Sequence, residues 1–240
     1  MDYCPISDIY NEIQHPVNGE KDESTALEAP DINAVNNKEF LEIDLLAKPR
    51  TNQRWSAHFL RRQQCWKVFS GDWKPELSDR IMYHKDSHIP DSENASIIGS
   101  SLWDRFTFKV RFNILSDSIK PPEGGVILFF LFKNIRNHYS FHFCLFKKKI
   151  ELIKRLNGAW TTVAEKNFNF VTGKEYMATV DTSSGVHQCS IDGVNQIETF
   201  DADISKGCVG IGAKYCDVEF NHISVLVPHK GASAEGKPVG

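Results

Sequence analysis

Two tryptophans, two histidines and one arginine have the types and positions that best suit ligand binding. Trp103 and Arg105 fall on the outward side of an alternating segment, and Trp160 comes shortly after an Asn-Gly turn. Flat aromatic faces stack on sugar rings, and neighbouring polar side chains hydrogen-bond to hydroxyl groups. We therefore predict a carbohydrate-binding set of Trp103, Arg105, His138, His142 and Trp160. For both tryptophans the alternative is packing beneath a loop or beneath the N-terminal arm.

The two histidines stand four residues apart in a segment of strand-like alternation. Four strand residues span about 13–14 Å at roughly 3.4 Å per residue, which is too far for His138 and His142 to share one metal ion. They are expected to act as independent polar residues of an outward face. Cys144 falls on the same face, but the sequence shows no cationic neighbour that would activate its thiol as a nucleophile.

Three acidic residues cluster near a predicted turn, at Glu198, Asp201 and Asp203. Carboxylate oxygens are the ligands that calcium prefers, so Asp201 and Asp203 are candidates for a calcium site. A solvated acidic loop is the alternative interpretation of the same residues. No other cofactor is predicted, since no phosphate-binding glycine loop or zinc motif occurs.

From about residue 55 onward, short segments rich in β-branched and aromatic residues alternate with clusters of Gly, Pro, Asn and Asp. This pattern is typical of strands joined by tight turns, and it shows no convincing period of 3.6 residues. About a dozen strands with short connections predict a large antiparallel sandwich or barrel. We expect strands at 57–61, 64–70, 79–84, 95–99, 103–113, 125–133, 138–146, 148–156, 159–165, 174–182, 185–192, 195–200, 207–213 and 216–226.

Period-two alternation also predicts which side chains form the core, because successive residues of a strand point to opposite faces. The predicted core residues of segments 103–113 and 138–146 are Phe106, Phe108, Val110, Phe112, Tyr139, Phe141, Phe143 and Leu145. Segment 125–133 is apolar on both faces, so it should be a central strand that is covered on each side. Near Asn221 and His222 the apolar spacing changes, which predicts a β-bulge.

Four stretches resemble the concanavalin A-like lectin/glucanase superfamily, in order along residues 60–226. They are WKVFSGDWK at 66–74, SLWDRFTFKVRF at 101–112, the segment from GGVILFFLFK to NHYSFHF at 124–143, and the closing pair at 207–225. The chain is similar to modules related to family 16 glycoside hydrolases and to the 3-keto-disaccharide hydrolase domain. The resemblance implies an all-β fold, an antiparallel two-sheet jelly-roll sandwich, preceded here by an irregular N-terminal arm.

Retaining glucanases of this superfamily use two carboxylates about 5–5.5 Å apart, within an E-x-D-x-x-E or E-x-D-x-E signature. The nearest match is Glu42-Ile43-Asp44, which lacks the third acid and lies upstream of the predicted sandwich. We therefore predict no catalytic residue. The leading hypothesis is a non-catalytic carbohydrate-binding module. The alternatives are a glycoside hydrolase with an unrecognised carboxylate pair, and a protein-interaction or assembly scaffold.

Charge is distributed unevenly along the chain, although the formal net charge is only −3. Residues 1–48 carry 11 acids and 3 bases, and the remainder carries 20 acids and 25 bases. The acidic arm could dock another protein, or the basic tip at Lys147–Lys149. That tip could equally bind an acidic glycan or a phosphate surface, or simply protect a sheet edge from aggregation. The body is not basic enough to predict a nucleic-acid partner.

Length and composition suit one globular domain with tails, because 240 residues with 41% hydrophobic and 25% charged residues exclude wholesale disorder. We expect an acidic arm at 1–54, partly extended or a short helix over 37–48, then the sandwich at 55–227 and a flexible tail at 228–240. No apolar run is long enough to predict a membrane partner. Six cysteines without a disulfide framework, and no visible signal peptide, predict a cytoplasmic protein with reduced thiols.

Overall fold

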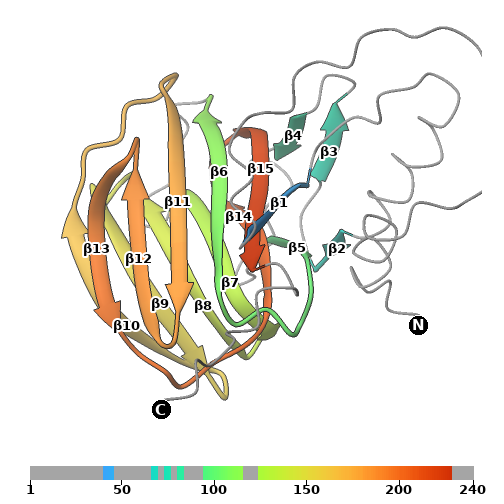
Figure 1. Cartoon of the computed structure of the whole chain (residues 1–240). Coiled ribbons are helices and arrows are strands. Elements are labelled where there is room, and N and C mark those ends of the chain that lie inside the picture. Colours follow the sequence, from blue (N-terminus) through green and yellow to red (C-terminus); the bar gives the residue numbers. More distant parts are fainter. Residues whose placement is uncertain are drawn as a thin grey trace, which may run out of the picture.

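The structure, a computed structural model, is an antiparallel two-sheet β-sandwich, as the alternation predicts. It describes residues 40–45, 66–69, 73–76, 80–83, 94–115 and 124–228. Within these residues every regular element is a strand, and there is accordingly no helix of the length and apolarity that crossing a membrane requires. Figure 1 shows β11, β12 and β6 of one sheet in front of β8 and β9 of the other.

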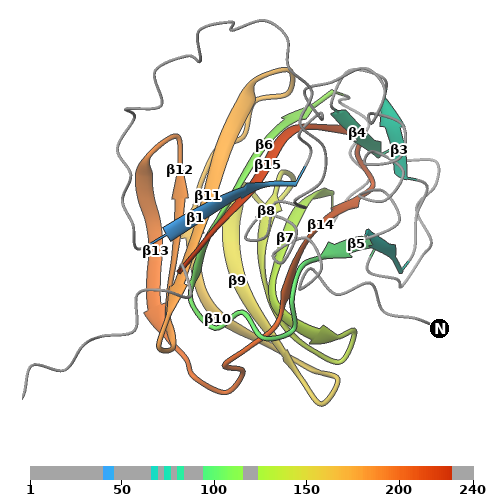
Figure 2. The same cartoon turned by 45° about the vertical axis from the view of Figure 1, so that its right-hand side comes forward.

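The first sheet has eight described strands and the second has seven. In spatial order the first contains β13 (Val194–Phe200), β12 (Val186–Ile191), β11 (Glu175–Ser183), β6 (Phe106–Ile114), β15 (Val218–Pro228), β4 (Arg80–Tyr83) and β3 (Trp73–Glu76), with β1 (Phe40–Asp44) also paired to β15. The second contains β10 (Ala159–Asn167), β9 (Lys149–Leu156), β8 (Asn137–Cys144), β7 (Gly125–Asn134), β14 (Cys208–Lys214), β5 (Ala95–Ile98) and β2 (Lys67–Val68). Figure 2 shows the two curved layers from a second direction.

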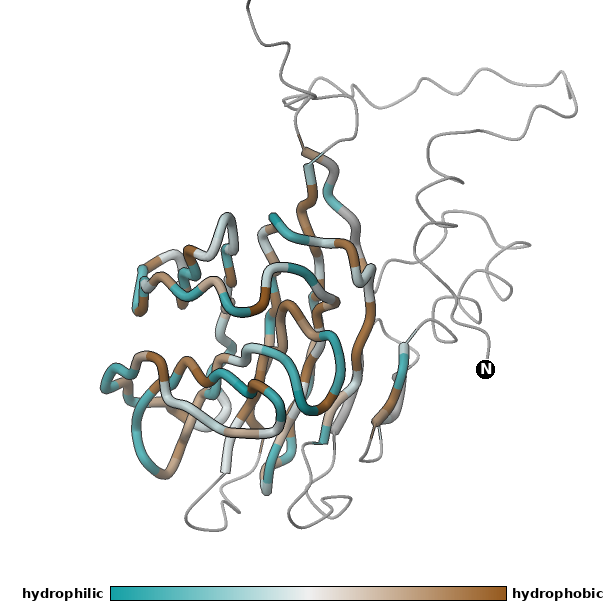
Figure 3. Tube along the Cα trace, turned by 90° about the horizontal axis from the view of Figure 1, so that it is seen from below, coloured by the Kyte–Doolittle hydropathy of each residue, from teal (hydrophilic) through white to brown (hydrophobic). Residues whose placement is uncertain are grey.

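Phenylalanines fill the space between the sheets, as predicted. The predicted core residues of β6 and β8 are at most 2% exposed, and Leu145, just beyond β8, is 8% exposed. Phe112 of the first sheet meets Phe143 of the second with ring centroids 5.4 Å apart. Burial of each such ring stabilises the fold by about 1.5–3 kcal/mol. Figure 3 shows the matching alternation of hydrophobic and hydrophilic positions along the trace.

Strand β7 is buried on both faces, which confirms its predicted central position. One face contributes Leu128 and Phe130 to the main core, and the other places Ile127 and Phe129 in a second apolar cluster. This second cluster also contains Ala95, Ile97, Phe132 and Cys208. The outer side of the seven-stranded sheet is therefore apolar around β7.

The predicted strands agree with the observed ones within a few residues wherever both can be compared, and the register shift between Phe220 and His222 confirms the predicted bulge. Strand β3 was not predicted. The predicted strand at 57–61, most of the arm at 1–54 and nearly all of the tail at 228–240 lie outside the described residues. Of the two alternatives for the arm, partly extended or a short helix over 37–48, the structure has the extended one at strand β1.

Strand β1 forms because β15 offers it an edge. β4 pairs with Val218–Phe220 of β15, and β1 pairs with the remaining part of the same edge, from Ser224 to Pro228. Backbone hydrogen bonds to an open edge satisfy donors and acceptors that would otherwise be unpaired, and here they outweigh the local helical spacing. The pairing places Phe40 and Glu42 beside the outer face of the eight-stranded sheet.

Candidate functional site

Trp160 stands on the outer face of the seven-stranded sheet, near the start of edge strand β10. The turn that precedes it has Asn157 at φ 54° and Gly158 at φ 91°, the left-handed pair that a tight hairpin requires. This turn pairs Trp160 directly with Arg155 of β9. The Arg155 guanidinium lies 4.6 Å from the centre of the Trp160 ring, and 47% of Trp160 remains exposed. The stacked guanidinium holds the indole in place while leaving part of it open to a ligand.

His138 and His142 lie beneath this indole, so the structure brings three of the five predicted residues together. Their rings meet Trp160 edge-on, with centroids at 6.0 and 6.5 Å and interplanar angles of 82° and 81°. Both histidines are on the predicted face of β8, but both are buried, which corrects the expectation that they are exposed. His138 is covered because it also stacks on Phe132, at 5.2 Å. We call Trp160, Arg155, His138 and His142 the Trp160 platform.

His142 is a neutral structural residue. Burial, reinforced by the positive charge of Lys214, lowers the pKa of His142 to about 3. Its Nε2 lies 2.9 Å from the Oγ of Ser140, which is itself fully buried. A serine and a histidine in hydrogen-bond contact could form a nucleophile and base, but this serine has no access to a substrate. The pair instead satisfies two buried polar groups under the platform.

Cys144 is also unsuited to nucleophilic chemistry. Burial and a hydrogen bond to Glu151, with Sγ to Oε2 at 3.1 Å, raise the pKa of its thiol to about 12. Glu151 in turn accepts from Lys149, whose Nζ lies 2.7 Å from Oε1 of Glu151 and 2.7 Å from Oε2 of Glu165. The predicted basic tip therefore has one of its lysines paired with two acids.

Trp103 and Arg105 lie apart from the Trp160 platform. Strand β6 begins at Phe106, so both residues belong to the turn before it, not to the strand as predicted. Trp103 is half-buried, with its ring centroid 6.2 Å from that of Phe106. It covers Gly99, where a Cβ atom would lie only 2.4 Å from the indole ring. Trp103 therefore packs against the end of the sandwich, whereas Arg105 is exposed with its guanidinium 5.0 Å from the centre of the Phe40 ring.

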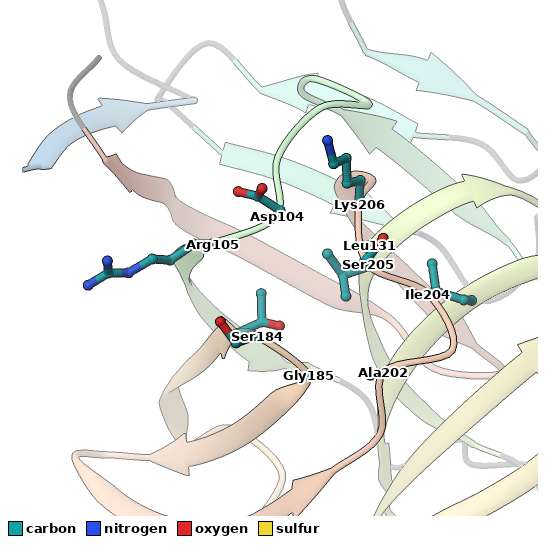
Figure 4. Close-up of a pocket in the computed structure, with 10 residues that line it drawn as sticks. Asp104, Arg105, Leu131, Ser184, Gly185, Ala202, Ile204, Ser205 and Lys206 are labelled. Carbon is teal, nitrogen blue, oxygen red and sulfur yellow. The ribbon is translucent and has the colours of Figure 1, made fainter. Parts of the chain in front are cut away.

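Two open hollows flank Arg105. The end hollow, of about 350 Å³, is lined by Asp104, Arg105, Leu131, Thr182, Ser184, Gly185, Ala202, Ile204, Ser205 and Lys206. The face hollow, of about 300 Å³, is lined by Phe40, Arg105, Phe106, Thr107, Asp181, Thr182, Ser183, Val186, Gln188 and Glu198. In Figure 4, Arg105 extends from the start of β6 away from Leu131 and Ile204. Most of these residues were not singled out from the sequence, because only strand register brings them together.

The predicted calcium ligands, Asp201 and Asp203, form ion pairs with Lys154. Nζ of Lys154 lies 2.5 Å from Oδ2 of Asp201 and 2.6 Å from Oδ2 of Asp203. Although burial raises the pKa of Asp201, hydrogen bonds from Lys154 and Tyr139 outweigh that effect and hold it below its ordinary value. The described residues contain no group of three metal-binding side chains. An ammonium group between the two carboxylates does not fit a calcium site there.

In the near-match to a glucanase signature, the carboxylate of Glu42 has a hydroxyl and an ammonium group as partners. Oε1 of Glu42 accepts a hydrogen bond from Oγ of Ser224 at 3.1 Å and lies 3.8 Å from Nζ of Lys109. Glu42 sits on short strand β1, at the margin of the eight-stranded sheet. The side chain of Asp44 lies outside the part of the chain that the structure describes.

The fold is found in many solved structures. The carbohydrate-binding module CBM66 of Bacillus subtilis superimposes with a TM-score of 0.57 and 18% identity, over 67% of this chain and 94% of that one. A protein of unknown function with a galectin-like fold, also from B. subtilis, gives 0.53 and 13%, over 70% and 93%. The VIP36 exoplasmic/lumenal domain, in a form bound to Ca²⁺ and Man3GlcNAc, gives 0.51 and 13%, over 73% and 87%.

Sequence comparison adds nothing to this likeness. No protein-family model matches the chain, and no curated protein matches its sequence. At identities of 18% and below, the structural matches establish the fold alone. The chain has the jelly-roll sandwich fold of the concanavalin A-like and galectin-like type.

Proposed function

We propose that this protein is a non-catalytic carbohydrate-binding module and that the Trp160 platform contacts the sugar. The observation that carries the proposal is a half-exposed indole held in a fixed orientation by Arg155, His138 and His142. Preorganised aromatic groups bind with little loss of conformational entropy. The structural likeness to a carbohydrate-binding module and to a lectin domain supports the same ligand class.

The absence of catalysis is part of the proposal. Ser140 and His142 are buried beneath the platform, and the pKa of the Cys144 thiol is raised far above neutrality. Thus these serine, histidine and cysteine side chains lack either access or reactivity, and the neighbouring carboxylate of Glu151, paired across the strands with His142, is buried and bound to Lys149. We expect no hydrolysis of aryl glycosides by the full chain between pH 4 and pH 8.

A glycan array tests the proposal with three proteins. Wild type should bind at least one sugar, and Trp160→Ala should weaken that binding about 10–100-fold, as expected for loss of a central aromatic anchor. Phe146→Ala is the matched control, because Phe146 is also an exposed aromatic residue, at 53%, but lies in the turn that joins β8 and β9. Equal binding by all three proteins, or no binding by wild type to any sugar, would refute the proposal.

We further propose that sugar binding does not require calcium through Asp201 and Asp203. Lys154 already neutralises both carboxylates at 2.5 and 2.6 Å. A divalent cation would have to displace this ammonium group before it could use either aspartate. Excess EDTA should therefore leave the affinity for an array hit unchanged, and a loss restored specifically by Ca²⁺ would contradict this assignment.

A further inference from the structure

The two hollows beside Arg105 form a second polar surface, away from Trp160. The face hollow lies on the opposite sheet, and the end hollow also meets Leu131 of β7 at the end of the sandwich. They share Arg105 and Thr182, so they adjoin at the end of the eight-stranded sheet. At about 350 and 300 Å³, each falls at the lower end of the range for small-molecule sites. We call the two hollows together the Arg105 groove.

Strand register arranges the floor of the face hollow as a row of polar side chains. Thr107 of β6 pairs with Asp181 of β11, Asp181 with Gln188 of β12, and Gln188 with Glu198 of β13. The Thr107 hydroxyl donates to Asp181, and Nε2 of Gln188 donates to Oε2 of Glu198 at 2.9 Å. These contacts orient the donors and acceptors before a ligand arrives, which favours binding.

An aromatic ring borders this polar row. Phe40 lines the face hollow from strand β1, and the Arg105 guanidinium lies 5.0 Å from its ring centre. Apolar C–H surface and hydroxyl groups alternate on a sugar ring, and the hollow offers an aromatic ring next to hydroxyl, amide and carboxylate groups. This combination suits a polyhydroxylated ligand better than a purely apolar or purely ionic one.

The charges of the groove disfavour an anionic ligand. Arg105 and Lys206 are cationic, whereas Asp104, Asp181 and Glu198 are anionic, so the lining carries a net charge of −1. A sulfated glycan or a uronic acid would face three carboxylates, and like-charge contacts oppose binding. The hydroxyl groups of a neutral sugar can donate to those carboxylates and accept from Arg105 or Lys206.

We propose that the Arg105 groove is a second carbohydrate-binding site, which takes a neutral glycan of at least two sugar units, one over each hollow. Arg105 lies between the units and contacts both. Because Trp160 and the polar row lie on the outer faces of opposite sheets, one molecule can engage two glycan chains. On a polysaccharide surface, such bivalency raises apparent affinity without any new contact.

Backbone-amide NMR titration of the full chain tests this proposal. The probes are neutral oligomers of two to six glucose, mannose, galactose, xylose, fructose or N-acetylglucosamine units, with glucuronic-acid and sulfated oligomers as charged counterparts. Arg105→Ala and Gln188→Ala remove one contact each. Arg111→Ala is the matched control, because Arg111 is an exposed arginine on the same outer face, paired with Glu175 at 3.5 Å and outside both hollows.

The proposal expects a neutral oligomer to shift the amides of groove residues with an affinity at least tenfold above that of its monosaccharide. Arg105→Ala and Gln188→Ala should weaken this binding at least tenfold, while Arg111→Ala and Trp160→Ala leave it unchanged. Amide shifts confined to the residues of the Trp160 platform would overturn the proposal that the Arg105 groove binds a glycan, and would leave the proposed function intact. Preference for the charged oligomers, or equal binding by Arg105→Ala and wild type, would also overturn it.

Discussion

Replacing Asp201 with asparagine should destabilise the sandwich by about 2–3 kcal/mol. The carboxylate accepts a hydrogen bond from the hydroxyl of Tyr139, a fully buried residue, and pairs with Lys154, with side chains of Lys154 and Asp201 15% and 13% exposed. Hydrogen bonds to charged groups contribute about 1.5–3 kcal/mol. Removing one partner of a buried ion pair costs about 3–5 kcal/mol. The cost is smaller here, because Lys154 keeps Asp203 and the asparagine oxygen can still accept from Tyr139.

The stability difference between wild type and Asp201→Asn should also depend on pH. Since the pKa of Asp201 is lower in the folded protein than in the unfolded chain, its contribution is present above the unfolded value near 4 and is lost as pH falls through the folded value. The stability gap between wild type and Asp201→Asn should therefore be constant from pH 7 to about pH 5 and close progressively below pH 4.

Thermal and urea unfolding, followed by circular dichroism, measure both effects. For a domain of this size 2–3 kcal/mol corresponds to a fall in Tm of about 4–12 °C. Asp192→Asn is the matched control, because Asp192 pairs with Lys174 at 3.3 Å with both side chains well exposed, and such pairs contribute at most about 1 kcal/mol. Equal losses in the two variants, or a gap that persists unchanged at pH 3, would refute the assigned role of Asp201.

Three further predictions concern packing and protonation. Gly207→Ala should destabilise by about 1–3 kcal/mol or more in urea unfolding, because its Cβ would lie 2.1 Å from the Leu131 backbone carbon; wild-type stability would contradict the close approach of these two backbone segments. Cys144, whose pKa is raised to about 12, should react with iodoacetamide at pH 8 about a thousandfold more slowly than a thiol of ordinary pKa near 9, measured by peptide mass spectrometry; alkylation at the ordinary rate would show that the thiol is not held as described. His142, whose pKa is lowered to about 3, takes up a proton at a higher pH in the unfolded chain than in the folded protein. It should therefore remain neutral by NMR at pH 5, and its contribution should make stability fall as pH drops below about 6.5; a titration of its ring near pH 6.5 would show that it is not buried.

Local pattern was sufficient for most of the strands, though not for β1 and β3, and for the composition of the core. Phe106, Phe108, Phe141 and Phe143 could be placed inside because residues two apart in a strand share a face. The same rule put His138 and His142 on the outward side, correctly, yet predicted exposure where the structure has burial. Alternation specifies the face of a residue but carries no information about what packs over that face.

Contacts between distant segments explain two further differences between prediction and structure, at strand β1 and at the candidate calcium ligands. Phe40 became part of a strand only because β15 presents an open edge more than 180 residues later. The candidate calcium ligands Asp201 and Asp203 meet Lys154, about 47 residues earlier in the chain. Local spacing reveals neither β15 as the partner of β1 nor Lys154 as the partner of the two aspartates. Tertiary pairing can override local propensity and can bring together charges from distant parts of the chain.

By itself, the sequence determined an all-β chain, most of its strands, the inward phenylalanines and the bulge beside His222, since each depends on neighbouring residues and on the fixed period of a strand. Only the tertiary structure decided that Trp160 stands over two buried histidines while Arg105 lies between two hollows, one on the other sheet and one at the end of the sandwich. The register between strands distant in the chain places those side chains, and register is set by packing of the whole sandwich.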